Sequence, residues 1–107
     1  MAEAFAKYAN ALAKAGKEIK NIPMYVNAWL GPQPGQTEAG QWPSGGPSSL
    51  VLDEWKKHAP DIDILCPDIY ELEALEVMSQ YHRKDNPLFI PESRRLSLLP
   101  AIGADVN

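Results

Sequence analysis

Three amphipathic segments alternate with three short apolar segments along the chain, and this alternation limits the possible fold more than any other feature. The amphipathic segments have the spacing of helices and span residues 2–20, 47–58 and 71–82. The apolar segments have the composition of buried strands and span residues 23–29, 62–70, where the strand should end near Pro67, and 88–91. Consecutive strands that are separated by a helix run parallel and are joined by right-handed crossovers. The sequence therefore predicts an α/β fold with about three parallel strands.

A stretch rich in proline and glycine, residues 30–46, separates the first predicted strand from the second predicted helix. Its composition excludes regular secondary structure. A loop of this length is unusual inside a compact domain, where it is either a disordered linker or a binding surface. Trp42 lies within the stretch and favours a binding surface.

Composition and charge exclude several classes of partner. The chain has 107 residues, a net charge of −4 and a pI near 5.0. Binding to nucleic acid or to an anionic membrane surface requires clustered Lys and Arg, which an acidic chain lacks. No apolar stretch approaches the roughly 20 residues that cross a bilayer. Because the N-terminus has no basic segment followed by an apolar one, we expect no export signal and a cytoplasmic location by default.

The sequence contains no pattern that predicts a metal or cofactor site. Cys66 is the single cysteine and lies in an apolar run, where we expect it to be buried and inert. His58 and His82 fall at the C-terminal ends of predicted helices, where histidine stabilises the helix dipole. Residues 44–47 resemble a phosphate-binding turn only weakly, because no lysine and no dinucleotide-binding spacing accompany them. No spacing of His, Cys, Asp and Glu is typical of a metal site.

The segment Pro87-Leu-Phe-Ile-Pro-Glu92 places one carboxylate at the point where an apolar strand should end. In parallel α/β proteins, chemistry takes place at the carboxyl ends of the strands. A glutamate at such a position loses part of its hydration, and functional sites compensate for that loss. Glu92 is therefore the leading candidate for a catalytic residue. The alternative is a solvated glutamate that leads into the next turn.

Polar and aromatic residues also follow the other two predicted strands. Asn27 and Trp29 end the first strand, and Asp68 and Tyr70 end the second. Amide, phenol and carboxylate groups suit the hydroxyl groups of a neutral polyol, and an aromatic ring packs against the C–H face of a sugar. The alternative is that Trp29 and Tyr70 are aromatic residues of the core. This combination, with Glu92, favours a carbohydrate as the ligand.

Four segments of the chain, taken together, resemble the sequence pattern of a known enzyme family. They are residues 23–29 (PMYVNAW), 42–47 (WPSGGP), 62–70 (IDILCPDIY) and 86–92 (NPLFIPE). They resemble bacterial β-galactosidases of glycoside hydrolase families 35 and 42. The resemblance covers residues 1–95 and implies about the fifth to seventh strands of a catalytic (β/α)₈ barrel. Residues 96–107 do not continue it and are expected to be a divergent or truncated tail.

The resemblance also implies roles for individual residues. In that superfamily two glutamates act in a retaining mechanism, and the glutamate after the seventh strand is the nucleophile. Glu92 matches this position. A tyrosine after the sixth strand commonly contacts the nucleophile, and Tyr70 matches that place. The substrate-binding residues that the resemblance implies are Asn27, Trp29, Trp42, Asp68 and Tyr70.

The chain departs from the family pattern at the acid/base residue. That glutamate follows the fourth strand in an Asn-Glu pair, which is absent here because Glu3 and Glu18 belong to the first helix. Neighbouring strands lie about 4.8 Å apart, so Asp68 and Glu92 would approach the 5–5.5 Å separation of a retaining pair if their strands pair. The resemblance nevertheless gives Asp68 a supporting place.

A complete barrel needs about 250 residues and eight strands, so three strands indicate a fragment. We expect the isolated chain to have little or no glycosidase activity, and its unpaired sheet edges to favour self-association. Two non-catalytic alternatives remain open. The chain is either a fragment that completes a barrel in trans, or a small sugar-binding module.

Overall fold

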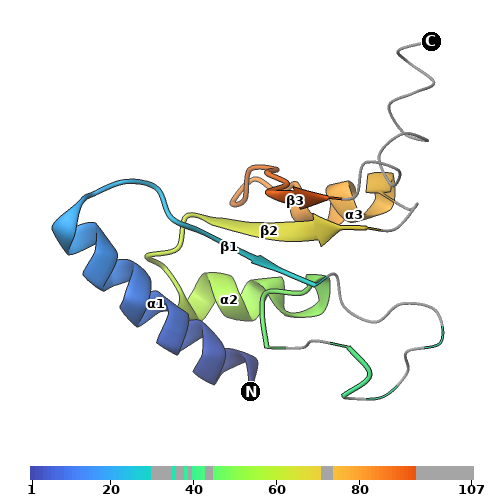
Figure 1. Ribbon diagram of the computed structural model, residues 1–107, viewed down its shortest axis with the longest axis horizontal. Coiled ribbons are helices and arrows are strands. Elements are labelled where there is room, and N and C mark those ends of the chain that lie inside the picture. The colour runs from blue at the N-terminus through green and yellow to red at the C-terminus, as the bar shows by residue number, and fades with distance from the viewer. Residues whose placement is uncertain (30–34, 36–37, 39, 43–44, 71–73, 94–107) are drawn as a thin grey trace, which may run out of the picture.

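The computed structural model describes residues 1–29, 35, 38, 40–42, 45–70 and 74–93 and shows an α/β arrangement (Figure 1). The elements are α1 (Ala2–Ile19), β1 (Tyr25–Ala28), a 3-10 turn (Ser49–Val51), α2 (Leu52–His58), β2 (Ile64–Ile69), α3 (Ala74–Tyr81) and β3 (Glu92–Ser93). The strands form a parallel sheet in the order β1-β2-β3. The predicted α/β class with three parallel strands is confirmed.

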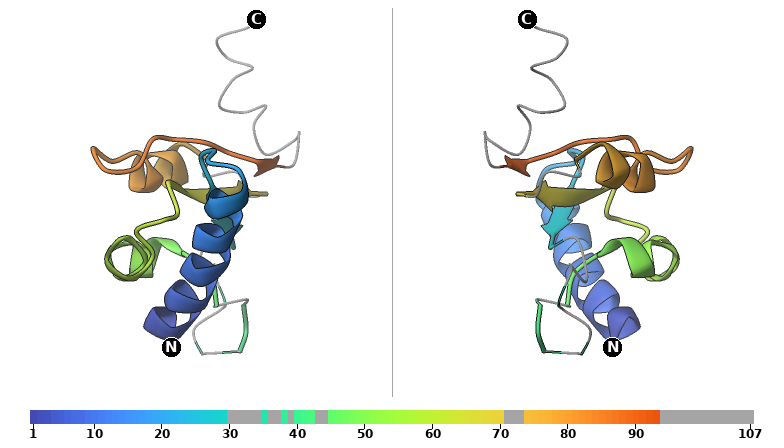
Figure 2. Two further views of the ribbon diagram at one scale, coloured as in Figure 1. Left: turned by 90° about the vertical axis from the view of Figure 1, so that its left-hand side faces the viewer. Right: turned by 90° about the vertical axis from the view of Figure 1, so that its right-hand side faces the viewer.

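The helices α2 and α3 lie on the same side of the sheet, as the side views show (Figure 2). Leu65 and Ile69 of β2 are buried in the core on this side. Side chains alternate between the two faces of a strand, so Cys66 and Asp68 belong to the opposite face. Each crossover between neighbouring strands therefore places its helix on one face and leaves the other face to the candidate site residues.

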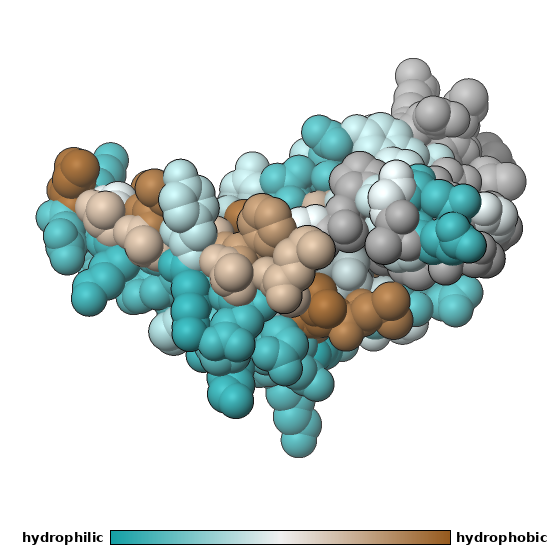
Figure 3. Space-filling view, turned by 90° about the horizontal axis from the view of Figure 1, so that it is seen from below, coloured by the Kyte–Doolittle hydropathy of each residue, from teal (hydrophilic) through white to brown (hydrophobic). Residues whose placement is uncertain are grey.

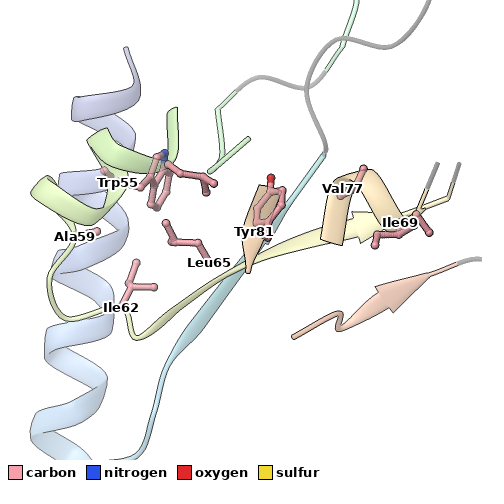
Figure 4. Packing of buried hydrophobic residues seen from close by; sticks show 10 residues of the cluster. Trp55, Ala59, Ile62, Leu65, Ile69, Val77 and Tyr81 are labelled. Atoms are coloured by element: carbon pink, nitrogen blue, oxygen red, sulfur yellow. The ribbon is translucent and has the colours of Figure 1, made fainter. Parts of the chain in front are cut away.

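The core fills the layer between the helices and the sheet (Figure 4). Trp55 of α2, Leu65 of β2 and Tyr81 of α3 belong to the same buried cluster in this layer. Tyr81 is fully buried, and its hydroxyl donates a hydrogen bond of 2.8 Å to the carbonyl oxygen of Pro47. Burial raises the pKa of the Tyr81 phenol, which therefore stays neutral.

Asn86 joins β2 to the segment that leads into β3. Its Nδ2 donates to the carbonyl oxygens of Leu65 and Tyr81, both at 2.9 Å, and its Oδ1 accepts from the Leu65 N–H at 2.8 Å. The Asn86 side chain is 1 % exposed, so no water replaces these partners. Because Arg83 and Asn86 also pair through their backbones, this contact fixes the turn that delivers β3 to the sheet.

An ionic contact holds the amino ends of β1 and β2 together. The Asp63 carboxylate accepts a hydrogen bond of 2.8 Å from the Met24 N–H and forms an ion pair of 2.7 Å with Lys17 of α1. The hydrogen bond from Lys17 and then that from Met24 lower the pKa of Asp63. In the register between β1 and β2, Tyr25 pairs with Ile64 and Asn27 pairs with Cys66.

Several predicted boundaries are wrong. Residues 88–91 were predicted as the third strand, but β3 is Glu92–Ser93 and begins where that prediction ends. Pro87 precedes this run and Pro91 ends it, and neither has an N–H to donate to a hydrogen-bonded ladder. Glu92 therefore opens its strand instead of following it. The second helix was predicted from residue 47, but α2 begins at Leu52 after the 3-10 turn.

The first helix agrees with its predicted span of residues 2–20, and Cys66 is buried as expected. Burial is the main cause that raises the pKa of the Cys66 thiol to about 11, which keeps it protonated. Within the described ranges, no helix combines the length and the apolar character that crossing a membrane requires. The predicted tail, residues 96–107, and most of the predicted loop lie outside the described residues.

Candidate functional site

Five of the six predicted site residues come from the carboxyl ends of β1 and β2 and from β3. Asn27 is the third residue of β1, and its register partner on β2 is Cys66. Asp68 lies two residues beyond Cys66 on the same face of β2, and its register partner on β3 is Glu92. Register partners on parallel strands point to the same face. Asn27, Asp68 and Glu92 therefore share the sheet face that lies opposite the helices.

A direct hydrogen bond joins β1 to β2 within this group. The Asn27 Nδ2 donates to the Asp68 Oδ1 at 2.7 Å. Asn27 is exposed and Asp68 is partly buried, so this contact sits at the boundary between the sheet and solvent. The bond fixes the amide of Asn27 next to the strand that carries Tyr70.

A second direct hydrogen bond joins the end of β2 to β3. The Tyr70 hydroxyl donates to the Glu92 Oε2. Tyr70 directly follows β2 and has the same parity as Asp68, so its phenol reaches across the sheet face to the carboxylate of Glu92. This is the contact between tyrosine and candidate nucleophile that the resemblance implies.

The charge of Glu92 acts on the neighbouring carboxyl group of Asp68. The pKa of Asp68 is raised, first by burial and then by the negative charge of Glu92, while the hydrogen bond from Asn27 acts in the opposite direction. Strands in a sheet lie about 4.8 Å apart, so register partners bring two carboxyl groups into close range. The pairing of β2 with β3 therefore places Asp68 next to Glu92.

The two tryptophans are less closely tied to this group. Trp29 directly follows β1 and is partly buried, and its indole Nε1 is enclosed without a hydrogen-bond partner among the described residues. Trp42 is partly buried, and within the described ranges no hydrogen bond or ring contact connects it to the other site residues. The structure therefore brings together Asn27, Asp68, Tyr70 and Glu92.

The chain returns from the loop region directly against the end of β1. A Cβ atom at Gly46 would lie 2.7 Å from the Cβ of Ala28, closer than side-chain carbons approach each other. Glycine is required at this position because only its missing side chain allows the approach. The returning segment therefore passes beside the strand end that carries Asn27 and Trp29.

Tyr25 and Phe89 form a pair that the sequence did not reveal. Their rings meet edge to face with centroids 5.1 Å apart and an interplanar angle of 83°. Tyr25 shares the site face, because it lies two positions before Asn27 along β1. The two rings are 50 % and 43 % exposed, which leaves an aromatic surface on this face of the sheet. The alternation of side chains along residues 23–29 was the one sequence signal that could have placed Tyr25 on the same face of the sheet as Asn27.

Among the residues that the structure describes, no three His, Cys, Asp or Glu side chains gather in a way that could hold a metal ion. The site instead offers a carboxylate supported by a phenol, a second carboxyl group with a raised pKa, and an amide. This set can bind hydroxyl groups and can supply a nucleophilic oxygen. No protein-family model matches the chain, and no curated protein matches its sequence.

Proposed function

We propose that the chain forms part of a retaining β-galactosidase with a (β/α)₈ barrel, in which Glu92 is the nucleophile. The hydrogen bond from the Tyr70 hydroxyl to Glu92 is the observation that carries this proposal. A phenol that donates to one carboxylate oxygen orients the other oxygen toward a substrate. The order of parallel strands and crossover helices is compatible with one part of a barrel.

Glu92 would attack the anomeric carbon of a β-galactoside. One oxygen of its carboxylate would form a bond to that carbon, and the bond from the carbon to the leaving-group oxygen would break. Water would then cleave the resulting glycosyl ester, which returns Glu92 to its starting state. Asp68 and Asn27 lie one and two strands away from Glu92 and would bind the hydroxyl groups of the sugar, with Trp29 and Trp42 lining the site.

This mechanism requires a second carboxyl group to protonate the leaving oxygen, and the sequence contains no Asn-Glu pair to provide it. Among the residues that the structure describes, Asp68 is the one other carboxyl group at the site. It is engaged by the amide of Asn27 and sits beside the nucleophile, which suits a supporting role. The isolated chain is therefore expected to bind a galactoside without hydrolysing one whose leaving group needs a proton.

The prediction concerns lactose and methyl β-galactoside, whose leaving groups need that proton. We expect the purified chain to release no galactose from either sugar, because general acid catalysis supplies about 10²–10⁴-fold of the rate. Galactose release is measured by a coupled assay with an enzyme blank. Release that disappears in Asp68→Asn would show that Asp68 is the acid. Release that disappears only in Glu92→Gln would show that the acid lies elsewhere in this chain.

A second candidate function is the completion of a barrel by association with another polypeptide. An apolar groove of about 280 Å³ lies between α1 and β1 and is lined by Ala9, Leu12, Ala13, Met24, Tyr25, Val26 and Ile62. Figure 3, which views the molecule from below, shows apolar surface between the polar side chains. Leu12 is 60 % exposed, and β1 has a strand partner on one side only within the described residues. A free strand edge beside an apolar groove suits an added strand.

Association of this kind predicts that the chain forms dimers or larger species at high concentration. Leu12→Lys places a charge in the groove and is expected to shift the chain toward the monomer in analytical ultracentrifugation. Leu50→Lys is the matched control, because Leu50 is also exposed but lies in the 3-10 turn, away from the groove. A chain that stays monomeric at all concentrations, or an equal effect of both variants, would contradict self-association of the chain through this groove.

A further inference from the structure

The hydrogen bonds of Asn27 differ from those of two other asparagines in the chain. Asn10 pairs with Asp61 through both ends of its amide, donating to the carboxylate at 2.9 Å and accepting from the backbone N–H at 2.7 Å. Asn86 also uses both ends of its amide. Asn27 donates to Asp68, and its Oδ1 has no hydrogen-bond partner among the described residues. One end of its amide is therefore open to a ligand.

The charge of Asp68 determines which end of the amide is open. An ionised carboxylate can only accept hydrogen bonds, so it requires the NH₂ group of Asn27 to face it. The Oδ1 then points away as an acceptor. A protonated Asp68 can donate, and the Asn27 amide can then reverse and present its NH₂ group outward. The proton on Asp68 thus selects between an acceptor and a donor at the same place in the site.

The groups that surround Asp68 come from three strands and one helix. Asn27 faces it from β1, Cys66 and Tyr70 lie beside it along β2, and Glu92 is its register partner on β3. Tyr81 of α3 interacts with it through the sheet, and it stays neutral. Burial and the charge of Glu92 raise the pKa of Asp68, while Cys66 stays protonated because its own pKa is about 11. Cys66 and Tyr81 therefore do not change charge below neutral pH, and the negative charge of Glu92 is the neighbouring charge that raises the pKa of Asp68.

We propose that Asp68 is a positioning residue whose carboxylate fixes the orientation of the Asn27 amide, so that Oδ1 accepts a hydrogen bond from a hydroxyl group of the ligand. The inference rests on the proposed function in taking a galactoside as that ligand. It deepens that function by making Asn27 a hydrogen-bond acceptor toward the ligand. The site then selects a ligand that donates a hydrogen bond at this position.

The orientation can be followed directly in the ¹⁵N-labelled chain by nuclear magnetic resonance. The side-chain NH₂ resonance of Asn27 is expected to move as the pH falls, with a midpoint above the usual value for aspartate of about 3.9. Glu92→Gln is expected to lower that midpoint, because it removes the neighbouring negative charge. Asp68→Asn is expected to abolish the movement.

The Asn10–Asp61 pair supplies a matched control in the same spectra. The NH₂ resonance of Asn10 reports on Asp61, and it should respond to Asp61→Asn and not to Asp68→Asn. An Asn27 resonance that does not move with pH in the unmodified chain would overturn the proposal, even if a variant fails to fold. A movement that survives in Asp68→Asn would also overturn it.

Titration with methyl β-galactoside separates this inference from the proposed function. If both hold, the sugar shifts the Asn27 resonance at neutral pH, and binding to Asp68→Asn is about tenfold weaker because one well-oriented hydrogen bond is lost. Equal binding to both proteins would overturn the positioning role. A chain that shows the expected pH response but no response to the sugar would support the positioning role and reject the galactoside as the ligand.

Discussion

The Glu92→Gln variant is expected to release no 2,4-dinitrophenol from 2,4-dinitrophenyl β-galactoside, whereas the unmodified chain releases it in the presence of azide. This leaving group departs without a proton, so the reaction does not need an acid. Azide attacks the anomeric carbon of the glycosyl ester without needing a base. It therefore replaces the attack of water, which is the step that requires a base. General acid and base catalysis contribute about 10²–10⁴-fold to the rate. With the activated substrate and azide, the reaction should therefore be measurable even though ordinary galactosides are not hydrolysed.

The amide of glutamine cannot form the ester, and for this reason the expected loss is complete. Glu76→Gln is the matched control, because Glu76 is an exposed glutamate on α3, away from the site face. Its release of dinitrophenol should equal that of the unmodified chain. Equal release from Glu92→Gln and the unmodified chain would show that a different group attacks the sugar.

The Asn86→Leu variant is expected to lower the free energy of unfolding by about 3 kcal/mol, because burying unpaired backbone groups costs roughly 1–3 kcal/mol each. Leucine has nearly the same size, but it leaves the N–H and carbonyl oxygen of Leu65 and the carbonyl oxygen of Tyr81 without these partners. Small domains are stable by about 5–15 kcal/mol in total, so this one change should remove a large part of the stability.

Urea unfolding followed by tryptophan fluorescence measures this effect. Asn10→Ala provides the comparison, since it removes a partly buried pair with Asp61 and should cost about 1 kcal/mol. Equal midpoints for the two variants would show that the Asn86 contacts do not hold β3 in place.

The sequence predicts elements best where local periodicity decides the structure. The helical spacing of residues 2–20 agrees with α1, and the two apolar runs around Asn27 and Asp68 agree with β1 and β2. The third strand was misplaced because an apolar composition was given more weight than the missing N–H groups of Pro87 and Pro91. A two-residue strand such as β3 gives no periodic signal at all.

The candidate site residues could be chosen from the sequence, but their contacts could not, apart from that of Tyr70 with Glu92, which the resemblance implies. Which side chains meet depends on the register between strands, and a shift of one residue would move each side chain to the other face of the sheet. The bond from Asn27 to Asp68 and the position of Asp68 opposite Glu92 both depend on that register. The role of Asn86 depends on how α3 packs beside β2, which local sequence does not determine.

Covalent trapping tests the central claim, that Glu92 is a glycosidase nucleophile, most directly. A 2-deoxy-2-fluorogalactoside with a dinitrophenyl leaving group forms the glycosyl ester but hydrolyses slowly, because the fluorine destabilises the charged transition state. Mass spectrometry of the digested chain would locate the added 2-fluorogalactosyl group. We expect the group on Glu92 and no modification of Glu92→Gln. A group attached to another residue, or a folded chain that binds methyl β-galactoside yet remains unmodified, would contradict the claim.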